Sequence, residues 1–167
     1  MVGVVPNAAY RHFADRDELL AAVCTVAMRE LAARMAAATG RVRGKYGDAA
    51  AARRRLRAIG RAYLEFARDE PGLFATAFAL PRQHAYDAQD AGTGKDPFPL
   101  DQLRAGLDEL VDAGVLSRQR RAGIEYPIWS TVHGLAVLTG QGPLRDAAVS
   151  TGRLEEVTRT FIEAGLT

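Results

Sequence analysis

Apolar residues recur at steps of three or four positions along nearly the whole chain, and no segment alternates convincingly between apolar and polar residues. The clearest series keeps to one face of a single helix and consists of Leu19, Leu20, Val23, Ala27, Leu31 and Met35. Such spacing is typical of amphipathic helices, whereas strict alternation would indicate strands. The sequence therefore predicts an all-α fold, in which each helix buries its apolar face against a neighbour.

Capping residues, glycines and prolines set the expected bounds of the helices. Asp15 and Glu18 form a capping box, in which Asp15 accepts from an amide three residues on and Glu18 reaches back to the amide of Asp15. The first helix should run from about Arg16 to Ala38. The others are expected at 49–68, 72–80, 99–114, 126–139 and 153–164. Loops are expected at 39–47, which holds three glycines, and at 81–98, which holds two glycines and two prolines.

The net charge of +2 is unevenly distributed. Residues 1–70 carry 13 Lys and Arg against 8 Asp and Glu, whereas residues 71–167 carry 9 against 12. The front of the chain is therefore basic and the rest acidic. A basic segment favours an anionic partner, although arginine is also common on solvated helix surfaces.

The composition disfavours several classes of protein. The single cysteine, Cys24, cannot form an internal disulfide and should be a small buried apolar side chain. No apolar run approaches the ~18 residues of a membrane span, and the N-terminus lacks the pattern of a secretory signal. We therefore expect a soluble cytoplasmic protein that has no membrane partner.

Enzymatic chemistry is not expected either. The three histidines lack the spacing of metal ligands. The segment GTGK at 92–95 lacks the wider spacing of a phosphate-binding loop and a preceding strand. Cys24 has no evident base partner. We expect no catalytic residues, no metal and no cofactor.

The stretch GVVPNAAYRHFADRDELL (Gly3–Leu20) resembles the end of the helix-turn-helix in TetR-type transcriptional regulators. Its first two residues match the end of the turn, Pro6–Phe13 match the recognition helix, and Arg16 matches the basic residue that starts the long connecting helix. Val5 departs from the pattern, since the family usually has serine there. The resemblance implies contacts to double-stranded operator DNA from Pro6, Asn7, Ala8, Tyr10, Arg11, His12 and Arg16.

The position of this segment in the chain bears on DNA binding. Regulators of the family have a first helix and a positioning helix before the turn, and here Met1 and Val2 stand where the positioning helix would end. The chain thus resembles an N-terminally truncated member of the family. Three explanations stay open: the start is misassigned, residues were removed, or the native gene lacks the two helices. An eight-residue helix is marginal on its own, so residues 1–167 alone are expected to bind DNA poorly. Operator DNA is the expected partner if the native protein has the missing helices.

The segment PIWSTVHGLAVL (Pro127–Leu138) resembles the Trp…His-Gly signature of one C-terminal ligand-binding subclass of the same family. The resemblance implies a pocket for a small hydrophobic effector. The residues expected to line it are Tyr63, Phe66, Phe74, Phe78, His84, Tyr86, Trp129 and His133. Ordinary core packing is the alternative for each aromatic residue. His133 lies on an otherwise apolar helix and needs a partner, for which a protein carbonyl is expected before a ligand.

The last two expected helices favour a homodimer. Residues 126–139 and 153–164 are apolar on more sides than one core uses, which favours a two-fold interface built from both. The expected domains are 1–38, a remnant of the DNA-binding domain with the connecting helix, and 39–167, the ligand-binding and dimerisation domain. The resemblance implies a ligand-responsive transcriptional regulator, with repression as the family expectation. The alternative is a helical dimeric module that binds a small molecule or a partner and does not bind DNA.

Overall fold

The computed structural model describes residues 13–78, 98–145 and 149–166, and within them it contains helices and no strands. The helices are α2 (Arg16–Gly40), α3 (Ala49–Asp69), α4 (Pro71–Ala77), α6 (Pro99–Asp112), α7 (Arg118–Arg121), α8 (Glu125–Gly140) and α9 (Thr151–Leu166). The prediction of an all-α fold is confirmed. Each expected helix is present with its ends shifted by a few residues, and α7 is an addition that the apolar spacing did not indicate.

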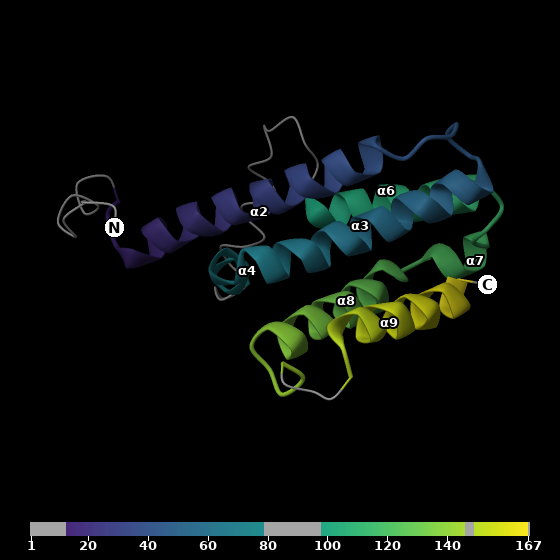
Figure 1. Cartoon of the computed structure of the whole chain (residues 1–167). Helices are drawn as coiled ribbons and strands as arrows, with labels where there is room; N and C mark the ends of the chain where they lie inside the picture. The colour runs from purple at the N-terminus through teal and green to yellow at the C-terminus, as the bar shows by residue number, and fades with distance from the viewer. Residues whose placement is uncertain (1–12, 79–97, 146–148, 167) are drawn as a thin grey trace.

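The helices form two layers (Figure 1). The first contains α2 and α3, which run side by side in opposite directions, together with α6. The second is the pair α8 and α9, which lies along α3. The N-terminal half of α2 projects beyond the other helices, and residues 13–23 include no fully buried side chain.

Local signals explain where the helices begin. Asp15 Oδ1 accepts from the amide of Glu18 at 2.8 Å, as the capping box predicts, but the Glu18 carboxylate accepts from the amide of Ala14 instead of that of Asp15. Asp48 caps α3 in the same manner through the amide of Ala51. Proline occupies the first turn of α4 and α6. Amides in the first turn have no carbonyl partner within the helix, so the missing N–H of proline costs no hydrogen bond there.

Two apolar clusters hold the layers together. One joins α2, α3, α4 and α8 around Leu31, Phe66 and Phe74. The other joins α3, α6, α8 and α9 around Leu56, Leu107 and Leu110, and it extends to residues packed beside it on α9. Since α3 contributes to both clusters, it is the central helix of the fold.

Cys24 is buried, which confirms the prediction for this residue. Its sulfur donates to the carbonyl of Thr76 at 3.1 Å, and burial raises the pKa of the thiol. Cys24 therefore packs α2 against α4 as a small apolar side chain.

Candidate ligand-binding pocket

A pocket of about 600 Å³ lies between α3 and α9, with α8 and parts of α2 and α6 at its base. Its wall is mainly apolar and includes Leu56, Ile59, Leu64, Trp129, Val132 and Ile162. These residues come from three helices whose apolar faces meet without filling the space between them. The size lies within the range of about 300–1,000 Å³ that is usual for small-molecule sites.

Ion pairs cross the pocket from α3 to α9. The Arg57 guanidinium donates to both carboxylate oxygens of Glu163, at 2.6 and 3.1 Å, and Arg159 reaches the same carboxylate at 3.4 Å. The hydrogen bond from Arg57 is the main reason why the pKa of Glu163 is lowered. A longer pair, Arg68 to Glu155 at 3.7 Å, joins the same two helices.

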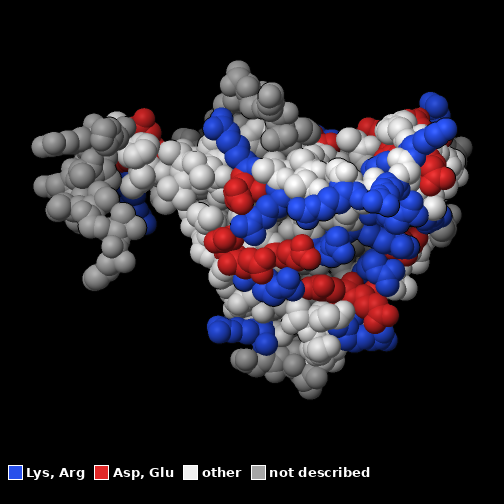
Figure 2. All heavy atoms as spheres, turned by 45° about the horizontal axis from the view of Figure 1, so that its top comes forward, with Lys and Arg blue, Asp and Glu red and all other residues white. Residues whose placement is uncertain are grey.

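Figure 2 shows that basic side chains form a band across one face of the molecule, with acidic side chains along its lower side. The basic residues of the pocket wall are Arg54, Arg57 and Arg61 on α3 and Arg159 on α9. The acidic ones, Glu155, Glu156 and Glu163, all come from α9. The pocket therefore has an apolar base and a rim that carries both signs of charge.

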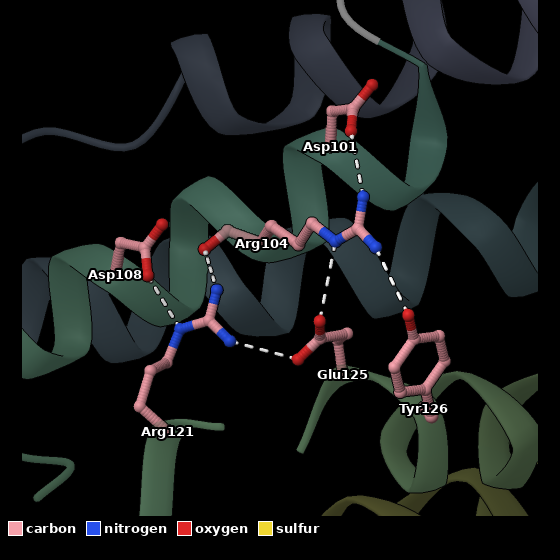
Figure 3. A network of polar contacts seen from close by, with 6 residues as sticks. All are labelled: Asp101, Arg104, Asp108, Arg121, Glu125 and Tyr126. Atoms are coloured by element: carbon pink, nitrogen blue, oxygen red, sulfur yellow. Dashed lines mark hydrogen bonds and ion pairs between the residues drawn. The ribbon is translucent and has the colours of Figure 1, made fainter. Parts of the chain in front are cut away.

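A polar network fixes the start of α8, the helix that carries Trp129 (Figure 3). Glu125 is 7% exposed and accepts from Arg121 at 2.9 Å and from Arg104 at 3.4 Å. Arg121 also reaches Asp108, and Arg104 reaches Tyr126. Burial alone would raise the pKa of Glu125, but a backbone hydrogen bond and the two arginines outweigh it and lower that pKa.

An aromatic cluster lies beside the pocket. Tyr63, Phe74, Phe78 and His133 have ring centroids between 4.6 and 6.3 Å apart. The Tyr63 hydroxyl and His133 Nδ1 form a hydrogen bond of 2.8 Å, whose direction depends on the tautomer of the imidazole. Burial raises the pKa of Tyr63 and lowers the pKa of His133, so both groups favour their neutral forms. The partner of His133 is thus a tyrosine hydroxyl and not the protein carbonyl that we expected.

The predicted pocket residues occupy different places in the structure. Tyr63 and Trp129 line the pocket. Phe74, Phe78 and His133 stand with Tyr63 in the aromatic cluster. Phe66 is fully buried in the core, with the Arg34 guanidinium 5.2 Å from its ring. His84 and Tyr86 lie outside the described residues.

Sequence reasoning did not identify the charged residues of the pocket or Gly60 and Gly152, which also line it. In the sequence, the arginines of α3 were noted only as part of the excess of positive charge in residues 1–70. Gly60 does stand out in the sequence, since a glycine inside a periodic helix costs about 1 kcal/mol relative to alanine. The charged residues of α9, which lies across the pocket from α3, give no comparable local signal in the sequence.

Of the predicted DNA-contacting residues, only Arg16 is described, and it is the exposed first residue of α2. The other six lie outside the described residues: Pro6, Asn7, Ala8, Tyr10, Arg11 and His12. The structure thus gives the start of the connecting helix and not the segment before it.

The outer surface of α8 and α9 carries exposed apolar side chains. Val137 and Leu138 on α8 and Val157 and Phe161 on α9 are each at least 40% exposed, and Phe161 reaches 68%. Exposed apolar side chains of this size are a feature of association surfaces. These helices correspond to the predicted dimer segments 126–139 and 153–164.

None of the helices that the structure describes has the length and hydropathy needed to cross a membrane. Among the same residues, no group of three or more histidine, cysteine or acidic side chains is arranged to hold a metal ion.

Comparison with known proteins gives a family match and several similar solved structures, two of which are described below. A family model described as "Tetracyclin repressor-like, C-terminal domain" matches residues 56–161. A Rhodococcus sp. RHA1 protein described as having unknown function gives a TM-score of 0.74 at 24% identity, over 98% of this chain and 79% of that chain. The TetR family transcriptional regulator PfmR from Thermus thermophilus gives 0.62 at 20% identity, over 99% and 82%. No curated protein matches the chain.

Proposed function

This chain belongs to the family of tetracyclin repressor-like C-terminal domains, and from that premise we propose that it is a ligand-responsive, DNA-binding transcriptional regulator of the TetR type. The observation that carries the proposal is the pocket of about 600 Å³ between α3 and α9. Most of its lining residues lie within the matched region, and it has the size and mainly apolar wall of a small-molecule site. The Trp…His-Gly subclass, suggested by residues 127–138, is part of the proposal.

The effector site is the pocket with its neighbouring aromatic cluster. Tyr63 belongs to both, because it lines the pocket and bonds to His133 behind it. A ligand against Tyr63 and Trp129 therefore also acts on the residues that pack α4 and α8 against α3. In this way the cluster couples occupancy of the pocket to the position of α4, which packs directly on α2.

The regulator acts as a homodimer through α8 and α9. Four exposed apolar side chains on these helices, Val137, Leu138, Val157 and Phe161, support this interface. A two-fold dimer of this type presents two DNA-binding segments to a palindromic operator. The DNA contacts come from Pro6, Asn7, Ala8, Tyr10, Arg11, His12 and Arg16.

Regulation is a shift between two bundle geometries. Ligand binding favours a geometry in which the two DNA-binding segments no longer match the operator spacing, so the protein represses in the absence of ligand. Differential affinities of about 1–3 kcal/mol are typical of such coupling.

A helical dimeric module that binds a small molecule or a partner without binding DNA is the second candidate. What supports it is that the family match is to a C-terminal domain, residues 56–161, which holds most of the pocket wall and most of α8 and α9. This candidate shares the pocket and the dimer surface with the first.

DNA capture from cells separates the two candidates. The protein is expressed from its own gene with an affinity tag and cross-linked to DNA, and the retained fragments are sequenced. A regulator enriches a few palindromic sites, and substitution Asn7→Ala abolishes that enrichment, while Arg145→Ala on the exposed loop after α8 leaves it unchanged. Enrichment of no site above a tag-only control would remove DNA binding from the proposal.

A further inference from the structure

No contact among residues 13–78, 98–145 and 149–166 explains why a glycine stands in the middle of α3 at position 60. Glycine is one of the weakest helix formers, and Gly60 is not among the glycines with positive φ. A Cβ at Gly60 would meet no heavy atom within 4 Å, whereas a Cβ at Gly106 would meet Ile59 Cδ1 at 3.1 Å. Close packing therefore accounts for Gly106 and not for Gly60.

The effect of Gly60 is to leave the wall of the pocket open. Gly152 does the same from α9, where an added Cβ would also meet nothing within 4 Å. Two helices that face each other across the pocket thus each lack a side chain at the wall. The described part of the chain supplies no side chain that fills this space.

The charges of the rim indicate the chemistry of that occupant. Each glutamate of the wall already has an arginine partner: Glu155 has Arg68 at 3.7 Å, Glu156 has Arg153 at 2.7 Å and Glu163 has Arg57 at 2.6 Å. The remaining arginines of the wall are less well neutralised. Arg159 shares Glu163 with Arg57, and among the described residues the one carboxylate paired with Arg61 is that of Glu65, at 3.7 Å.

Arg54 adds to this excess of arginine over carboxylate groups on the pocket wall. Its guanidinium donates to the carbonyl of Arg43, and no carboxylate within the described part of the chain forms an ion pair with it. The rim is therefore able to accept one more anion without separating the pair that joins α3 to α9. A cationic group would face the same arginines and be repelled.

We propose that the pocket binds an amphipathic organic anion, with its carboxylate at Arg61 and Arg159 and its apolar body along Gly60, Trp129 and Ile162. The proposal rests on the proposed function, because it names the class of effector for the same site. The apolar base accounts for the body of the ligand, and the surplus of guanidinium groups accounts for its charge. Arginine suits this task because its planar group donates two parallel hydrogen bonds to a carboxylate.

The chain carries its own reporter for the test. Trp129 is the only tryptophan and lines the pocket, so its fluorescence responds to an occupant directly. The purified full chain is titrated with decanoate, 1-decanol and decyltrimethylammonium, which share one apolar chain and differ in the head group. We expect saturable binding of decanoate, with an affinity about tenfold or more above that of the other two probes.

Two pairs of variants locate the binding. Gly60→Leu fills the wall and should abolish binding of every probe, while Gly165→Leu, at an exposed helical glycine away from the pocket, should not. Gly152→Leu repeats the test from the other wall if Gly60→Leu does not fold. Arg159→Gln should weaken decanoate about tenfold and leave 1-decanol unchanged, because it removes the charge but keeps the Arg57–Glu163 pair. Arg118→Gln on α7 is the matched control.

The outcomes separate this proposal from the proposed function. If 1-decanol or the ammonium probe binds as tightly as decanoate and Gly60→Leu blocks it, the class of ligand is wrong while the sensor role stands. If decanoate does not bind, or binds equally well to the Gly60→Leu and Gly152→Leu variants, the inference is overturned. The DNA capture experiment decides the regulator role independently of either result.

Discussion

Glu109 on α6 is only 4% exposed, and its carboxylate joins three parts of the chain. It accepts from Arg55 on α3 and from the amide of Gly47 in the preceding loop. Substitution Arg55→Met would leave this buried charge without its main partner. We expect a loss of about 2 kcal/mol in the free energy of unfolding, measured by urea titration.

The control for this substitution is Arg153→Met. Arg153 pairs with Glu156 on the exposed side of α9, where water screens both charges. The expected loss is less than about 0.5 kcal/mol. Equal losses in the two variants would contradict the role given to Glu109.

His133 makes stability depend on pH in a predictable direction. Burial holds its pKa in the folded protein below the ordinary value of 6.5. As the pH falls through that value, the unfolded chain takes up a proton that the folded protein resists, so the free energy of unfolding decreases. Substitution His133→Gln should make the change between about pH 7.5 and pH 5.5 smaller. Urea titrations at several pH values measure this, and an unchanged slope would contradict it.

Single residues differ in how far the sequence predicts them. The burial of Cys24 follows from its place on the apolar face of a helix. The need of His133 for a partner was predictable, but its identity was not, because Tyr63 is 70 positions away along the chain. The hydrogen bond depends on how α3 and α8 pack, which local spacing does not encode.

At the scale of helices, α8 and α9 form the surface where a second copy should bind. We expect the protein to be a dimer, and Phe161→Asp to weaken it by about 2 kcal/mol or more, which is roughly a 30-fold rise in the dissociation constant. Sedimentation at several concentrations measures this. The neighbouring exposed residue gives the control variant Thr160→Asp, which should remain dimeric. A monomeric wild type would contradict the predicted interface.

The helices were predictable to within a few residues because caps and prolines mark their ends. The start of α2 follows from Asp15 and that of α4 from Pro71. The four-residue helix α7 was missed, since it contains only arginine and glutamine and has no apolar spacing. Its Ser117 cap is a weak signal without an apolar run behind it.

For the molecule as a whole, binding of the effector and binding of DNA should each weaken the other. If the proposed function holds, decanoate at saturation should lower the operator affinity of the protein expressed from its own gene by about 5- to 150-fold. By linkage, operator DNA should lower decanoate affinity by the same factor. Fluorescence anisotropy of labelled operator and the Trp129 signal give the two factors, and unequal factors would contradict a simple coupling of the two sites.

The pocket was predictable only in part. Of the residues predicted for an effector pocket, Tyr63 and Trp129 lie in the wall of this pocket, and its role as an effector site stays a proposal. Its charged rim depends on α9 lying opposite α3, an arrangement between segments about 100 residues apart. Residue types along one helix do not reveal which helix faces them.

The free end of α2 has a mechanical consequence. The helix has 25 residues, and its buried contacts end near Cys24 while its first turn stands clear of the bundle. With a rise of about 1.5 Å per residue, Arg16 lies about 28 Å from Met35, so a tilt of about 5° at the core moves it by about 2.5 Å. The same tilt moves Leu31 by about 0.5 Å and Cys24 by about 1.4 Å, so the displacement grows along the helix and is largest at its free end.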